Sequence, residues 1–285
     1  MTLKNTGFIL FIFFISCLTP RVLKARTKMT WGLLTVWAEE MGIEQKGNLF
    51  FARGKVDAKR LDVSLLCDEA IFDKTKGVLK ALGNVLLSKG SARLSCGFLI
   101  LFDSEQRGLA RMQPLLIKDL VRESHRKNPD GSIAMVNSKV ALMGKEIEFF
   151  KDTEIIHSRG DAIAIEVPSY IEDQAILIED TEFLNKIYAD TIEIYGKTAK
   201  SIGRGNVRVL TEELIGTGNK GIYLKNKNRL IITGDALVFQ TQKKEIPDKK
   251  ESINRVRGDK IVVFPESKQT IIIGTVKSKV FQSPE

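Results

Sequence analysis

DTIEIYGKTAKSIGRGNVRV, residues 190–209, is the stretch of sequence that decides the fold. Ile192 and Ile194 alternate with polar side chains, and after a short turn Val207 and Val209 do the same. Period-2 alternation places successive side chains on opposite faces of a strand, so one face is buried and the other faces water. The stretch therefore predicts a strand, a turn and a second strand.

The same construction recurs along the chain: an acidic residue, apolar residues two and four positions later, and a Gly-x-Val unit fifteen positions later. The four copies are Glu39 with Met41, Ile43, Gly54 and Val56; Asp68 with Ala70, Phe72, Gly83 and Val85; Asp190 with Ile192, Ile194, Gly205 and Val207; and Asp259 with Ile261, Val263, Gly274 and Val276. The first two copies begin at positions 39 and 68, a spacing in the range that marks stacked supersecondary units. The repeats predict a β protein built from recurring strand units.

The repeated acids could be interpreted as catalytic carboxylates or cation ligands. Each opens its own strand at the same place in its unit, so we expect the four to be spread along the molecule with a structural role at a turn or strand start. Active sites bring unlike groups together, and repetition of like groups does not.

Composition limits the function classes. The 285 residues contain 44 Lys and Arg against 35 Asp and Glu, a net charge of +9. This excess suits an anionic partner, such as nucleic acid, a lipid surface or a phosphorylated glycolipid, and is also compatible with an ordinary solvated surface. With two His and three Cys, and without CxxC, HExxH, GxSxG or P-loop motifs, we expect no catalytic residues, no metal and no cofactor.

The N-terminus predicts export. Lys4 precedes the apolar run Phe8 to Leu18, which is followed by a small-residue cleavage site at Ala25. This is typical of a secretory signal peptide (1–25), and the run is short for a spanning helix. A retained membrane anchor and a lipoprotein site at Cys17 are the alternatives. In an oxidising compartment Cys67 and Cys96 could pair, or be two small apolar side chains on strands.

The rest of the chain reads almost entirely as strands, among them 47–56, 62–73, 78–87, 94–102 and 270–281. Residues 113–135 differ: a helical-looking piece, Leu115 to Glu123, precedes a charged stretch that contains His125 and an Asn-Pro-Asp-Gly turn. We interpret this segment as an insertion or connector between an N-terminal set of repeats, 26–112, and a C-terminal set, 136–285. A second pattern, Gly-x-x-apolar-x-apolar, starts at Gly144, Gly160, Gly234 and Gly258. The whole favours an all-β sandwich, jelly roll or solenoid.

The repeats supply a row of inward-facing apolar side chains between two β layers. If the layers close fully, the row is a core; if they splay, it is an apolar groove able to hold acyl chains. The residues alone leave both possibilities open.

The units CDEAIFD…ALGNVLL, YADTIEIY…IGRGNVRV and RGDKIVVF…IIGTVKSKVF resemble the OstA-like family of lipopolysaccharide-transport proteins, the LptA type, over most of 37–103 and 186–281. The resemblance implies a periplasmic, V-shaped β-jelly roll that is made of a pair of antiparallel sheets, is open like a taco and binds lipid A in its groove. It also implies end-to-end self-association through the terminal strands and contacts with inner- and outer-membrane components of a transport bridge, with no nucleic acid. The groove residues it implies are Met41, Ile43, Val56, Ala70, Phe72, Val85, Leu87, Ile192, Ile194, Val207, Val209, Ile261, Val263 and Val276.

Three functions follow as hypotheses. The first is a periplasmic lipopolysaccharide-binding carrier without enzymatic activity. The second is an LptC-like, membrane-anchored partner in the same pathway, which a retained N-terminal helix would distinguish. The third is a structural β-solenoid with a filled core, which would carry no lipid.

Overall fold

A computed structural model of the chain describes residues 27–31, 33–44, 48–127, 133–177, 181–211, 214–227, 229–242, 252–264 and 269–282. The predicted signal peptide, the side chain of His125 and most of the charged loop before Arg255 lie outside the described residues. None of the helices in the described part of the chain is long and apolar enough to cross a membrane.

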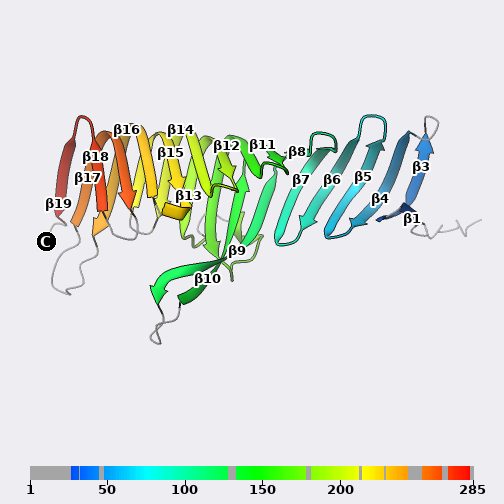
Figure 1. Cartoon of the computed structure of the whole chain (residues 1–285), viewed down its shortest axis with the longest axis horizontal. Helices are drawn as coiled ribbons and strands as arrows, with labels where there is room; N and C mark the ends of the chain where they lie inside the picture. Colours follow the sequence, from blue (N-terminus) through cyan, green and yellow to red (C-terminus); the bar gives the residue numbers. More distant parts are fainter. Residues whose placement is uncertain are drawn as a thin grey trace, which may run out of the picture.

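Strands in one 19-stranded antiparallel sheet make up nearly all of the described chain (Figure 1). The strands are β1 Thr27–Trp31, β2 Leu34–Ala38, β3 Glu40–Glu44, β4 Leu49–Arg60, β5 Val63–Asp73, β6 Val78–Lys89, β7 Ala92–Phe102, β8 Arg107–Arg111, β9 Leu115–Lys127, β10 Ile133–Met143, β11 Glu146–Phe150, β12 Ile155–Pro168, β13 Asn185–Tyr195, β14 Lys200–Thr211, β15 Leu214–Leu224, β16 Arg229–Gln242, β17 Ser252–Phe264, β18 Gln269–Ile273 and β19 Lys277–Gln282. Two short 3₁₀ helices, η2 Ala175–Leu177 and η3 Lys225–Lys227, lie in connections. The prediction of an all-β fold is confirmed.

The long strands other than β9 and β10 bend at their middle. In β14, Gly205 (φ 72°) and Asn206 (φ 46°) both take the left-handed conformation, and the pairing with β13 and β15 shifts register at the same point. Such a bulge bends a strand and increases its local twist. The same two-residue bend occurs at Gly54–Lys55, Gly83–Asn84, Gly160–Asp161 and Gly234–Asp235. The bends fall at matching positions in the strands that carry them, so the sheet folds along one line into two facing walls.

Successive hairpins alternate between the walls. Wall 1 consists of 27–31, 34–38, 56–67, 85–96, 114–127 with 133–143, 162–168 with 185–189, 207–211 with 214–217, 236–242 with 252–258, and 277–282; wall 2 consists of 40–44 with 48–53, 69–82, 98–111, 146–159, 191–204, 220–227 with 229–233, and 260–264 with 269–273. The spacing between the first two sequence repeats is therefore one wall 2 hairpin plus one wall 1 hairpin. This is the V-shaped β-jelly roll, built from repeated strand units, that the sequence predicts.

The apolar faces of both walls form one continuous core. On β6, Ala81 and Val85 lie on either side of the bend and are 0% and 1% exposed. They are an even number of positions apart, so the inward-facing residues follow the same alternation before and after the bend. On β5 the parity changes at the bend, since Cys67 and Ala70 are both buried while Asp68 between them is exposed. This change keeps apolar side chains on the inside of both walls, and the resulting cluster extends from Ala38 to Val263.

Residues 113–135 correct one part of the sequence interpretation. The helix expected from Leu115 to Glu123 is wrong, because these residues lie in β9, which pairs with β7 and β10. The β9–β10 hairpin continues wall 1 and projects beyond the neighbouring strands (Figure 1). The single strand expected over 270–281 is in fact β18 and β19, which lie in different walls on either side of Gly274.

The segment between β12 and β13, described at residues 169–177 and 181–184 and named the strap, covers part of the outer face of wall 1. Ile171, Ile176 and Phe183 of the strap pack with Ile117 and Ile165 in a second apolar cluster. Asp173 anchors the strap by ion pairs with Arg93 of β7 and with Lys139 of β10, the latter at 3.0 Å.

Cys67 and Cys96 are free and buried. They lie on β5 and β7, with β6 between them, so about 10 Å of sheet separates their strands, beyond the reach of a disulfide. Burial raises the pKa of Cys67 to about 12 and that of Cys96 to about 11, so both behave as small apolar side chains.

Candidate lipid-binding face

The inner faces of the two walls are packed tightly along the bend and more loosely away from it. On β13, Ile192 next to the bend is 1% exposed, whereas Ile194, two residues farther, is half-buried. On β6 the buried pair Ala81 and Val85 is flanked on both sides by the half-buried Leu79 and Leu87. The two walls therefore share a sealed base, and apolar side chains become accessible toward the turns.

These accessible side chains form a strip along both walls. The inner strip consists of the half-buried apolar residues packed against the core, which are Val36, Ala58, Leu87, Leu116, Ala164, Ile187 and Val256 on wall 1 and Met41, Leu79, Leu101, Phe149, Ile156, Ile194, Tyr223 and Ile272 on wall 2. Its members come from β2 at one end of the molecule to β18 at the other. A surface of this kind can contact an extended hydrocarbon while the base remains closed.

The residues predicted for the groove fall into three groups. Val56, Ala70, Val85, Ile192, Val207, Val209, Ile261 and Val263 are buried in the core; Met41, Phe72, Leu87 and Ile194 are half-buried; Ile43 and Val276 are 52% and 51% exposed. The two exposed residues lie at opposite ends of the molecule, in β3 and between β18 and β19, where each end strand pairs on one side only within the described residues. Their part in a groove stays a prediction.

The predicted groove residues leave out part of the inner strip, and the second sequence pattern does not follow the inner face in every strand. From Gly160 and Gly234 it selected the third and fifth residues, Ile165 and Phe239 among them. Ile165 belongs to the cluster under the strap, while the inner residues are at the second and fourth positions, as in Ala162 and Ala164. In a strand that contains the glycine bend, the inward-facing residues follow the same alternation on both sides of the bend. In a strand that contains the facing acid, the alternation shifts by one residue at the bend. Distinguishing these two strand types would have found the missing residues.

The four repeat acids lie along the bend, each against the glycine fifteen positions later, as expected for a structural role. A Cβ on Gly83 would lie 2.3 Å from Asp68 Oδ2, and those on Gly205 and Gly274 would lie 2.0 Å from the carboxylates fifteen positions earlier. Asp68 accepts a hydrogen bond from Asn84 Nδ2 at 2.9 Å. The acids are thus spread along the bend, each beside its own glycine, and do not converge on one site.

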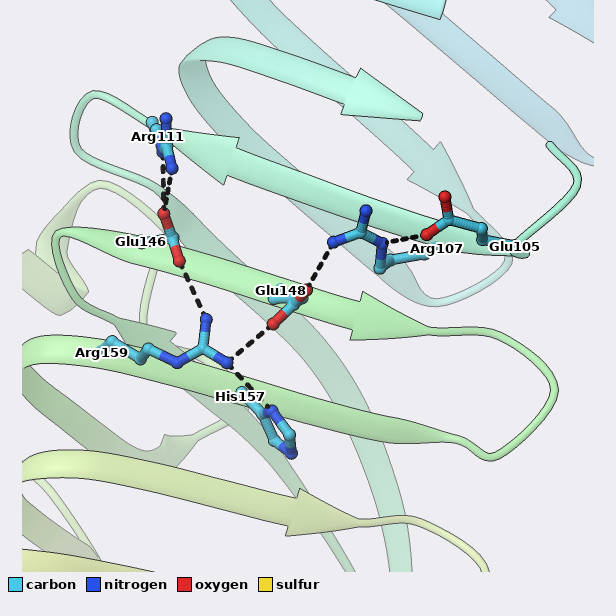
Figure 2. Close-up of polar contacts among 7 residues, drawn as sticks. All are labelled: Glu105, Arg107, Arg111, Glu146, Glu148, His157 and Arg159. Atoms are coloured by element: carbon cyan, nitrogen blue, oxygen red, sulfur yellow. Dashed lines mark hydrogen bonds and ion pairs between the residues drawn. The ribbon is translucent and has the colours of Figure 1, made fainter. Parts of the chain in front are cut away.

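A charged network occupies the outer face of wall 2 over β8, β11 and β12 (Figure 2). Glu148, 8% exposed, accepts hydrogen bonds from Arg107 at 3.0 Å and from Arg159 at 2.8 Å. Glu146 accepts hydrogen bonds from Arg111 and Arg159, while His157 Nδ1 lies 3.5 Å from Arg159. Burial raises the pKa of Glu148, but the hydrogen bonds from the two guanidinium groups outweigh it, so this pKa lies below its usual value.

The partners in this network satisfy one another and join strands from the N-terminal and C-terminal halves of the chain. In the part of the chain that the structure describes, no group of His, Cys, Asp or Glu side chains is arranged to hold a metal ion. The inner strip is the candidate site because half-buried apolar side chains follow it along both walls, and its chemistry is apolar contact.

The family model described as "LptA/(LptD N-terminal domain) LPS transport protein" matches residues 64–269, more than two thirds of the chain. Among curated proteins none matches. Among solved structures, the chain is similar to LptH from Pseudomonas aeruginosa, described as the LptA homologous periplasmic component of the lipopolysaccharide transport device, with 13% identity, a TM-score of 0.19, and coverage of 78% of this chain and 94% of that chain. The match to the family model shows that this chain belongs to the LptA/LptD N-terminal domain family of lipopolysaccharide transport proteins.

Proposed function

We propose that the protein is a periplasmic, non-enzymatic carrier that holds the acyl chains of lipopolysaccharide against its inner strip during passage toward the outer membrane. One observation carries the proposal: half-buried apolar side chains follow the inner faces of both walls along the whole molecule. Family membership supplies the class of cargo.

The energetics support a long apolar strip. Removing one methylene group from water is worth about 0.8 kcal/mol, so a chain of a dozen methylenes gains roughly 10 kcal/mol when fully covered. A lipid with several such chains needs continuous cover to cross an aqueous compartment. Because the strip has members on every wall 2 hairpin and on nearly every wall 1 hairpin, a lipid that slides along it keeps a nearly constant free energy. Direction must then come from partners at the ends, which we expect to be the inner- and outer-membrane components of the transport bridge.

Site-specific photo-crosslinking tests the proposal. A crosslinking amino acid at Leu101 or Ile194, both on the inner strip, should label lipopolysaccharide added to the purified protein. The matched controls are Ile100 and Ile222, which are also half-buried but lie on the outer face of the same wall. We expect strong labelling at the two inner positions and background labelling at the two outer ones.

Absence of labelling at the inner positions would favour a structural β-solenoid with a filled core, and equal labelling on both faces would contradict a carrier that shields lipid between its walls. The mass of the mature protein separates the carrier from a membrane-anchored partner. A chain that begins near Arg26 fits cleavage of the signal peptide, and a chain that keeps residues 1–25 fits the anchor.

A further inference from the structure

Turns at the free edge of wall 2 differ in charge along the molecule. In the N-terminal half the cations have partners: Lys76 pairs with Asp73 at 3.0 Å and Arg107 pairs with Glu105 at 2.7 Å. Farther along, Lys151 donates to Gln106 and is followed by Asp152 and Glu154. These turns carry little unbalanced charge.

The next two turns carry cations only. We name Lys200, Lys225, Lys227 and Arg229 the cationic edge; segments 196–200 and 225–229 contain no acidic residue. The two turns are neighbours, because the Lys225 amide donates to the Ala199 carbonyl at 2.9 Å and Lys200 is paired with Leu224. None of the four cations forms an ion pair with a described residue. Like charges on neighbouring turns repel one another, so the edge gains stability from an anion.

Aromatic rings hold two of these cations in place. Lys200 Nζ lies 5.4 Å from the centre of the Tyr195 ring, and the Arg229 guanidinium lies 4.9 Å from that of Phe264. Arg229 Nε is buried without an acceptor among the described residues. Ring contacts of this kind orient a cation without neutralising its charge.

The cationic edge lies at the rim of the wall that carries the inner strip. Lys200 and Arg229 are on the outer side of that rim, because both are paired opposite Leu224, the neighbour of the inward-facing Tyr223. Ile194 and Tyr223 are half-buried strip residues in β13 and β15, the strands that lead into the two turns. Ile194 and Tyr223 are each followed by one further strand residue before the turn begins, a rise of about 7 Å along the strand. A molecule with acyl chains between the walls would therefore place its headgroup at this edge.

We infer that the cationic edge binds phosphate groups on the headgroup of an anionic amphiphile whose acyl chains contact Ile194 and Tyr223. The inference rests on the proposed function and adds to it a preferred position and orientation for the lipid. Lysine and arginine are suited to this task because charge-assisted hydrogen bonds to phosphate are stronger than neutral ones.

The test compares bis-phosphorylated lipid A with the same lipid after removal of its phosphates. The variant Lys225→Gln/Lys227→Gln should lower affinity for the phosphorylated lipid roughly tenfold, as expected for two solvent-facing ion pairs, and leave binding of the dephosphorylated lipid unchanged. Lys80→Gln/Lys89→Gln, which removes the same charge from two exposed lysines elsewhere, should bind both lipids like the wild type. Lys225→Arg/Lys227→Arg should retain the preference.

The outcomes are distinguishable. Equal affinity of the wild type for both lipids, or an equal loss in the two glutamine variants, would overturn the cationic edge and leave the carrier intact. If neither lipid binds the wild type or any of the variants, the carrier is overturned as well. Inorganic phosphate at millimolar concentration should not compete with the phosphorylated lipid, and full competition would assign the edge to free phosphate instead.

Discussion

The bend in each strand depends on very few atoms. At Gly205 and Asn206 the backbone takes the left-handed conformation twice in succession, which glycine adopts readily and asparagine tolerates. The Asn206 amide then donates to Asp190 Oδ1 at 3.2 Å, and the carboxylate occupies the space that a Cβ on Gly205 would fill. The glycine therefore serves both conformation and close approach.

Substitution of Gly205 tests this dual requirement. Gly205→Ala should destabilise the protein by roughly 2–4 kcal/mol, since the left-handed conformation costs 1–2 kcal/mol and the clash with Asp190 adds to it. Gly90→Ala is the matched control, because Gly90 also has positive φ (54°) but nothing within 4 Å of its Cβ position. Urea unfolding measures both.

The double variant Asp190→Ala/Gly205→Ala removes the carboxylate and should recover part of the loss. If Gly205→Ala and Gly90→Ala cost the same, close approach to Asp190 contributes nothing, and conformation alone explains the glycine.

The residue pattern could be predicted from the sequence only where the acid is present. Lys145 with Gly160, and Asn219 with Gly234, stand in the same relation as Asp68 with Gly83, but the facing residue is not acidic. At Gly97 and Met112 the arrangement is reversed, with the left-handed conformation on Met112 and the glycine facing it. The bend requires left-handed backbone beside a compatible neighbour, and an acid is one of several that fit.

At the scale of elements, β9 shows why the helix prediction failed. Its apolar residues lie too close together for simple strand alternation, which made helical spacing the better match. The structure gives the reason: Leu116 packs against the inner core, whereas Leu115 and Ile117 lie under the strap, so both faces of the strand are covered. A strand covered on both faces loses its period-2 signal, and the covering strap follows far later in the sequence.

The strap should be held by charge in a pH-dependent way. A hydrogen bond from Arg93, opposed by burial and assisted by Lys139, lowers the pKa of Asp173 from 3.8 to about 2. The folded pKa lies below the unfolded one, so the stabilisation is complete above about pH 4 and is lost as the pH falls toward 2.

Asp173→Asn should make the strap several-fold more susceptible to cleavage by pepsin at pH 4–5, with the difference from wild type shrinking toward pH 2 as the wild-type carboxylate is protonated. Glu172→Gln, at an exposed neighbour without an ion-pair partner among the described residues, should cleave like the wild type. Mass spectrometry locates the cut. A difference that stays constant with pH would show that the Asp173 carboxylate does not hold the strap.

At the scale of the whole molecule, the elongated shape follows from the repeat. Each hairpin pairs with its neighbour through backbone hydrogen bonds, and within the described residues no strand returns to close the sheet (Figure 1). The sequence predicts this architecture because the spacing of the bends is regular. It does not predict which inner residues are half-buried, because their exposure depends on neighbouring hairpins and on the distance from the bend.

The ends of the molecule carry the last prediction, self-association through terminal strands. Within the described residues β18 pairs with β17 on one side only, and two large apolar side chains of this strand, Ile271 and Ile273, are 50% and 49% exposed. An unpaired strand edge with apolar side chains favours pairing with another chain, and lysine on such an edge prevents it. Ile271→Lys/Ile273→Lys should therefore weaken association in sedimentation velocity by at least about tenfold.

The control is Ile215→Lys. Ile215 is 39% exposed and lies on a strand that is paired on both sides, so this variant should associate like the wild type. A wild-type chain that stays monomeric at high concentration, or an edge variant that associates unchanged, would remove β18 as the assembly edge.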